Sequence, residues 1–94
     1  MKTLIAFHQL EDGDHWAKAW HKGEGGRHEM FAKVGAKCRT FRDAKNPDSA
    51  AVLIDVPDME AFESLMASDE GKKAMQEDGL KIETMRMLEE FTIE

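Results

Sequence analysis

Arg27 is the residue whose position most strongly suggests ligand chemistry. In a helical projection it lies near the centre of an apolar stripe, between Trp16 and Trp20. A buried guanidinium is costly unless it is paired or hydrated, so two arrangements compete. Either Arg27 binds a carboxylate, enolate or phenolate of a small ligand, or it pairs with an acidic residue of the sheet or extends to solvent.

Two histidines, His8 and His28, are candidates for proton transfer, because imidazole titrates near neutral pH. His8 ends the first apolar segment, and the alternative for it is an ordinary hydrogen-bonded residue at a strand end. His28 lies on the flank of the Arg27 helix, where a solvated position is the alternative. His21 lies seven residues earlier, about 10 Å away along a helix, which is too far for one zinc ion. We therefore predict no metal site.

Trp16, Trp20 and Phe31 form a concentrated aromatic face on the same stripe. Such a face is either part of the core or the wall of a cleft for a flat, hydrophobic ligand. Cys38 is read either as a small packed residue or as a nucleophile. The glycines at 23–26 do not follow a strand and do not form a phosphate-binding loop, so we expect no cofactor.

The apolar spacing predicts the elements that must position these residues. They are a strand over 2–9, a helix over 14–34, strands over 36–43 and 50–56, a helix capped by Asp58, a short helix over 69–78, and a strand over 81–91. Gly35 and Gly79 are expected to end the helices before them. This order predicts one α+β domain over residues 1–94, with the ferredoxin-like βαββαβ fold: a four-stranded antiparallel sheet with its helices on one face.

Residues 14–34 allow two interpretations. Gly23, Gly25 and Gly26 each disfavour a helix interior by about 1 kcal/mol, which favours two helices. Val34, however, returns to the azimuth of Trp16, and the apolar phase therefore continues across the glycines. On that ground we predict one helix that is weakened or kinked at its centre.

The first and third strands are apolar on both faces, although two helices can cover only one. We therefore expect the open sheet face to pair with a second copy of the chain, giving a homodimer. The net charge is −6, and no basic stripe is present, so neither nucleic acid nor an anionic membrane is an expected partner. A single cysteine and the lack of an apolar leader favour the cytoplasm.

A set of residues along nearly the whole chain resembles the dimeric α/β-barrel proteins, and among them the small bacterial members of the antibiotic-biosynthesis-monooxygenase-like superfamily. These residues are Trp16-x-x-x-Trp20, Arg27, Gly35, Arg39-Thr40-Phe41-Arg42-Asp43, Asn46-Pro47, Asp58 and Met87-Leu88-Glu89. The resemblance implies a barrel across the dimer and a ligand cleft between helices and sheet in each monomer. The superfamily shares no catalytic motif, so the resemblance assigns no reaction.

Three functional hypotheses follow. The first is a cofactor-free monooxygenase-like or isomerase-like enzyme, or a binding protein, for a small aromatic or oxo-acid ligand. In it Arg27 holds the anion, Trp16, Trp20 and Phe31 form the wall, and His8 or His28 moves protons. The second is a non-catalytic dimeric module with a filled cleft, and the third is a haem-binding or haem-degrading protein. An apolar pocket containing Arg27 and a histidine would favour the first.

Overall fold

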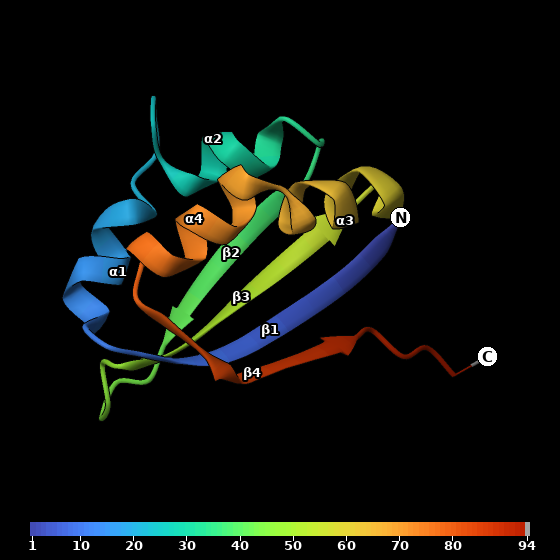
Figure 1. Cartoon of the computed structure of the whole chain (residues 1–94). Helices are drawn as coiled ribbons and strands as arrows, with labels where there is room; N and C mark the ends of the chain where they lie inside the picture. The colour runs from blue at the N-terminus through green and yellow to red at the C-terminus, as the bar shows by residue number, and fades with distance from the viewer. Residues whose placement is uncertain (94) are drawn as a thin grey trace.

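The computed structural model describes residues 1–93 as one layer of sheet beneath one layer of helices (Figure 1). The elements are β1 (Lys2–Leu10), α1 (Gly13–Ala19), α2 (Arg27–Ala32), β2 (Lys37–Arg42), β3 (Ser49–Val56), α3 (Met59–Ala67), α4 (Asp69–Glu77) and β4 (Leu80–Glu89). The strands form one antiparallel sheet in the order β2-β3-β1-β4. The predicted ferredoxin-like fold, with its helices on one face, is therefore confirmed.

Local signals in the chain explain where three of the helices begin. The side chain of Asp12 accepts hydrogen bonds from the free N–H groups at the start of α1, and Asp58 and Ser68 do the same for α3 and α4. Gly35 and Gly79 have φ angles of 74° and 75°, which favour glycine and stop the preceding helices.

The prediction of one helix over 14–34, weakened or kinked at its centre, is wrong, and the alternative of two helices is correct. The chain leaves the helical conformation at Trp20 and resumes it at Arg27, giving two short helices. Gly23 and Gly25 have φ angles of 126° and 83°, and a right-handed helix cannot contain such residues. The apolar phase nevertheless persists, because both helices pack against the same face of the sheet.

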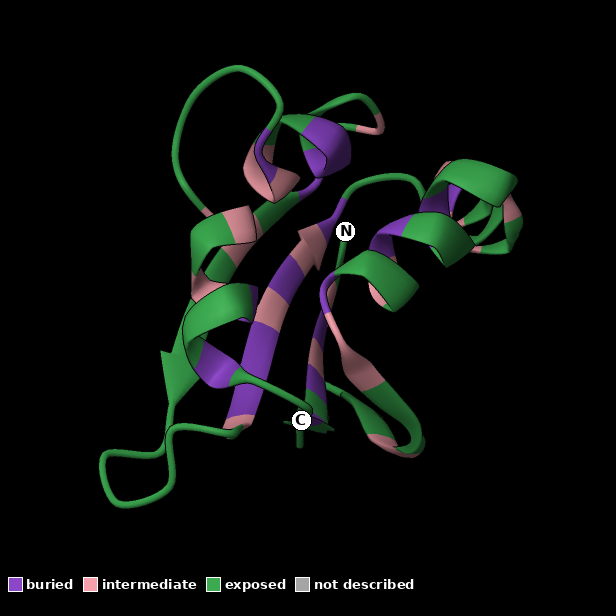
Figure 2. Ribbon diagram, turned by 60° about the vertical axis from the view of Figure 1, so that its left-hand side comes forward, coloured by how far each residue is buried: buried purple, intermediate pink, exposed green. Residues whose placement is uncertain are grey.

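The sheet has one covered face and one open face. Leu4, Ala6, Val52 and Ile54 point toward the helices and are buried. Their neighbours in the sequence point the other way, and Phe7 on that side is 42% exposed. Figure 2 shows the buried residues along the central strands, with exposed residues on the outer strand β2 and the later part of β4.

Candidate functional site

A cavity of about 60 Å³ lies between the covered face of the sheet and the helices. All four helices contribute to its lining, and β1, β3 and β4 form its floor. Five of the six predicted site residues line it: His8, Trp16, Trp20, Arg27 and Phe31. The lining is otherwise almost wholly apolar, so a polar group in it stands out.

His8 is the polar residue of the cavity floor. Its side chain lies on the covered face of β1 and is 4% exposed. Neither Nδ1 nor Nε2 has a hydrogen-bond partner. Because the unfolded chain would hydrate both nitrogens, this arrangement costs stability unless a bound molecule satisfies them. Burial lowers the pKa of His8, so the ring is neutral at neutral pH and can accept a proton.

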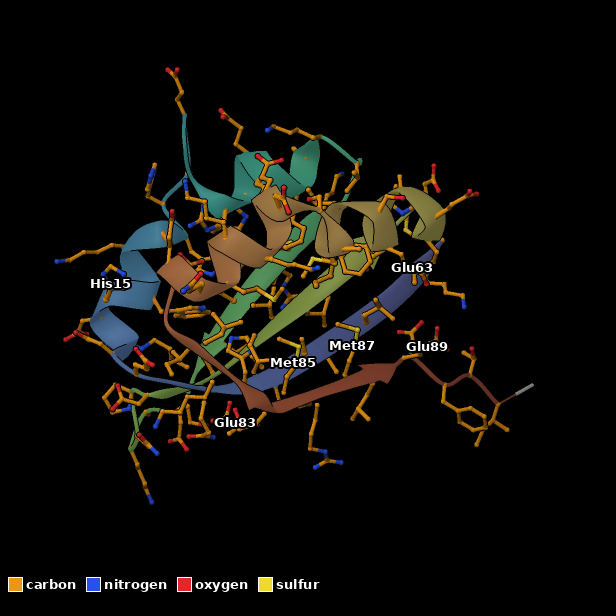
Figure 3. All side chains as sticks on the ribbon, viewed as in Figure 1. His15, Glu63, Glu83, Met85, Met87 and Glu89 are labelled. Carbon is orange, nitrogen blue, oxygen red and sulfur yellow. The ribbon has the colours of Figure 1, made fainter. Side chains whose placement is uncertain are left out.

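The strand pairing beside His8 is irregular. Phe7 pairs with Arg86 of β4, whereas Gln9 pairs with Lys81, so residues 82–85 bulge opposite His8. The backbone N–H of Gln9 donates a hydrogen bond to Thr84 Oγ1 at 2.9 Å. Bulges of this kind occur next to active sites, where they redirect side chains. In Figure 3, Met85 and Met87 extend from β4 toward the helices, and both line the cavity.

The aromatic residues form the wall that the sequence predicts. Trp16 packs edge-on against His8, with ring centroids 6.0 Å apart. Trp20 stacks on Phe31 at 5.7 Å with an interplanar angle of 9°. The Trp20 Nε1 atom is buried and, like the His8 nitrogens, has no hydrogen-bond partner. Trp20 thus carries a buried donor without a partner, in addition to the imidazole of His8.

Arg27 occupies one side of the cavity, and its guanidinium is paired. Nε lies 2.7 Å from Asp78 Oδ2, and Nη2 lies 2.8 Å from Asp78 Oδ1. Glu77 Oε2 lies 3.6 Å from Nη2. The hydrogen bond to Asp78 is the main reason that the pKa of Arg27 is raised. This acidic partner lies at the C-terminal end of α4, whereas the sequence had suggested an acidic partner in the sheet.

His28 is not among the residues that line the cavity. Its ring packs edge-on against Trp20, with centroids 5.2 Å apart. Cys38 is half-buried, and burial raises the pKa of its thiol to about 12. A thiol that stays protonated is a poor nucleophile, which fits the reading of Cys38 as a packed residue.

Sequence analysis missed two parts of the site. Asp78 was not singled out, although an acidic residue at a helix C-terminus opposes the helix dipole and therefore needs a nearby cation. The cavity is also lined by five methionines, which were not among the predicted site residues: Met30, Met66, Met75, Met85 and Met87. Their flexible side chains can adapt to different occupants.

Metal chemistry has no support in the arrangement of the usual ligands. Within residues 1–93, no group of three or more His, Cys, Asp or Glu side chains is placed to hold a metal ion. The polar side chains that line the otherwise apolar cavity are His8, Arg27 and Asp78, and of these only His8 has no hydrogen-bond partner within the described residues.

Comparisons with known proteins identify the fold. No family model matches the sequence, and no curated protein matches it. An antibiotic biosynthesis monooxygenase crystal structure superposes over 100% of both chains, with a TM-score of 0.72 and 13% identity. A Nitrosomonas europaea protein, whose structure is described as a putative antibiotic biosynthesis monooxygenase, also aligns over 100% of both chains, with a TM-score of 0.70 and 9% identity.

A third structure comes from a differently named family. It is an ethyl tert-butyl ether D family protein of Bacillus halodurans, which aligns over 99% of this chain and 100% of its own, with a TM-score of 0.52 and 15% identity. At these identities the likeness establishes the fold and leaves the chemistry open. The chain therefore has the ferredoxin-like fold of the antibiotic-biosynthesis-monooxygenase-like proteins.

Proposed function

We propose that this protein binds a small, mainly apolar organic ligand in the cavity and that His8 exchanges a proton with it, without a cofactor. The observation that carries the proposal is the pair of unpartnered nitrogens on His8, which is 4% exposed within an apolar enclosure. A ligand with one hydroxyl or carbonyl group would satisfy His8 and the Trp20 N–H together.

The charges around the cavity favour a neutral ligand over an anionic one. Of the two arrangements that the sequence left open for Arg27, a ligand anion or an acidic partner in the protein, the second is present: its guanidinium makes a bidentate pair with Asp78, which is 5% exposed. An anionic ligand would have to compete with this carboxylate and enter an apolar space. A neutral ligand carries no charge into that space.

Proton removal by His8 is the chemical step that the two proposed enzyme classes share. An isomerase-like reaction takes a proton from one ligand atom and returns it to another. A cofactor-free monooxygenase-like reaction uses the resulting carbanion to react with molecular oxygen. Both need a base that is neutral at working pH, and burial keeps His8 in that form.

The two alternative functions receive less support. A filled, non-catalytic cleft gives no role to the three buried polar atoms of His8 and Trp20 that have no hydrogen-bond partner. A haem-sized ligand is much larger than a cavity of about 60 Å³. Pockets for drug-sized molecules usually measure about 300–1,000 Å³, so haem would require extensive movement of the helices.

We also propose that two copies pair through the open face of the sheet. Phe7 and Phe41 flank Ala51 in one cross-strand row, and each phenyl side chain is 42% exposed. Leu88, paired with Ile5 in the next row, is 46% exposed. A contiguous apolar surface of this kind favours a self-complementary contact.

The ligand proposal is tested with a panel of small probes. Phenol and indole serve as neutral probes and benzoate as the anionic one, with binding followed by amide chemical shifts in the wild-type protein. We expect the neutral probes to shift the cavity residues and to bind more tightly than benzoate. His8→Phe keeps a ring but removes both nitrogens, and should weaken phenol binding about threefold to tenfold.

A matched control uses another histidine. His21 is exposed in the α1–α2 loop, so His21→Phe should leave phenol binding unchanged. Native mass spectrometry of the freshly purified wild-type protein would also reveal a co-purifying molecule. If no probe shifts the cavity residues and nothing co-purifies, the proposal fails; equal binding by wild type and His8→Phe would remove His8 from it.

A further inference from the structure

A second hollow lies directly outside the cavity. This outer groove has a volume of about 280 Å³ and runs between α2 and α4. Arg27, Met30 and Ala74 line both the cavity and the outer groove. One layer of side chains therefore separates the two spaces, and Arg27 is the charged member of that layer.

The volume of the cavity by itself is small for an organic ligand. An engineered apolar cavity that binds benzene measures about 150 Å³, and the cavity here measures about 60 Å³. A site for even one aromatic ring therefore needs additional space. The outer groove offers that space on the other side of Arg27.

The contact between α2 and α4 relies on side-chain ion pairs. The bidentate Arg27–Asp78 pair, at 2.7 and 2.8 Å, lies next to the cavity. The exposed pair of Lys33 and Glu70, at 2.9 Å, joins the same helices farther along. Within residues 1–93, no backbone hydrogen bond connects α2 to α4. Within these residues, Arg27 is therefore held against α4 by side-chain contacts and not by backbone hydrogen bonds.

Part of the segment that precedes Arg27 has open space around its backbone, although Gly26 itself lies close to His21. A Cβ atom added to Gly23 or Gly25 would have no neighbour within 4 Å, so the loop backbone there is not packed against the body. The N-cap residue of α2, Gly26, makes no side-chain capping bond. In the first turn of α2, Met30 is buried in the core and His28 packs on Trp20, whereas Arg27 makes the ion pair to α4.

We infer that the Arg27–Asp78 pair is a latch: when it opens, the cavity and the outer groove join into one ligand site. The ligand then has an apolar part, which enters the cavity, and a polar end, which lies among the charged side chains of the groove. This inference rests on the proposed function for its purpose. The opening of the latch can be measured without any ligand.

Acrylamide quenching of Trp16 fluorescence tests the latch. Trp16 is 2% exposed and lines the cavity, and Trp20→Phe leaves it as the single tryptophan. In that background, Arg27→Gln/Asp78→Asn removes both charges while keeping polar side chains of similar shape. We expect the acrylamide quenching constant of Trp16 to rise about fivefold, because the open population increases.

The control is the other ion pair between the same helices. Lys33→Gln/Glu70→Gln removes two charges from side chains that do not line the cavity, so Trp16 quenching should stay at the value of the background protein. Equal quenching in the latch variant and the background would overturn the inference, as would an equal rise in both double variants. If acrylamide reaches Trp16 past Met85 and Met87 instead, quenching in the Arg27→Gln/Asp78→Asn variant will equal that of the background protein.

A measurement in salt avoids dependence on the folding of the latch variant. In the Trp20→Phe protein, raising NaCl from about 0.05 M to about 1 M should screen the partly buried pair and increase Trp16 quenching about twofold. No increase would contradict the latch. If the probe panel fails while quenching responds, the ligand proposal falls and the latch stands; the converse result overturns the latch alone.

Discussion

The two faces of the sheet are built from the same strands but have opposite chemistry. On the covered face, Leu4, Ala6 and Ile54 are buried beneath the helices, and His8 interrupts them with two unsatisfied nitrogens. On the open face, Phe7 and Leu88 are large, apolar and half-exposed. One face therefore has a polar group without a partner, and the other has apolar groups without a cover.

This difference shows what each face lacks. The covered face already has its hydrophobic contacts, and what is missing there is a hydrogen-bonding molecule. The open face already has its polar backbone groups satisfied in the sheet, and what is missing there is apolar contact. The two deficits call for different partners, a small ligand for one face and a second protein surface for the other.

The largest expected effect comes from truncating one aromatic ring on each side. Phe62 of α3 is 3% exposed and packs against Phe31 above the covered face. Phe62→Ala should lower the free energy of unfolding by about 3–5 kcal/mol, because it leaves a cavity. Phe7→Ala, on the open face, should cost much less in the dilute monomer. Urea unfolding of both variants measures the contrast, and equal losses would abolish it.

The next effect concerns association through the open face. In sedimentation at micromolar concentration, the wild-type protein should have twice the 10.7 kDa mass of one chain. Phe7→Glu should give a monomer, because two buried carboxylates would meet across the interface. Ala67→Glu makes a similar change on the exposed end of α3 and should remain a dimer. A monomeric wild type would refute the pairing.

The smallest effect is the pH dependence that His8 gives to stability. Burial lowers the pKa of His8 in the folded state, so the unfolded chain takes up this proton first as pH falls. The free energy of unfolding should therefore decrease from about pH 7.5 to pH 5.5, as pH drops below the ordinary histidine value and through the folded one. Urea unfolding at both values measures it.

Two substitutions identify the histidine responsible for that dependence. His8→Leu should remove this part of the pH dependence and should stabilise the protein at low pH, because no buried group is left to protonate. His21→Leu, in the exposed loop, should leave the dependence as it is in the wild type. A pH dependence that survives in His8→Leu would mean that another group causes it.

The site could be predicted in part because residue direction follows from local periodicity. Trp16, Trp20, Arg27 and Phe31 share one helical stripe in the sequence, and all four line the cavity. The glycines indicated a break between α1 and α2, but the continuous apolar phase led to the prediction of one helix, because the azimuth gives only the direction in which a side chain points. The azimuth of the side chains does not depend on the backbone angles at Gly23 and Gly25, whose φ values are positive.

The sequence by itself determined the fold and the two apolar faces of the sheet. Alternation along β1 and β3, the capping residues Asp58 and Ser68, and the glycine stops are local properties, and each acts within a few residues of its position. Local physics of this kind can be read from sequence order alone.

Only the tertiary structure decided which side chains are satisfied. Arg27 finds Asp78 across 51 residues of chain, whereas His8, in the same cavity, finds no partner. Both outcomes depend on where α4 ends relative to α2 and β1, a distance set by the packing of the helices on the sheet. For that reason Arg27, the residue that first suggested a ligand, is paired within the protein, and His8 is the polar side chain left free for a ligand.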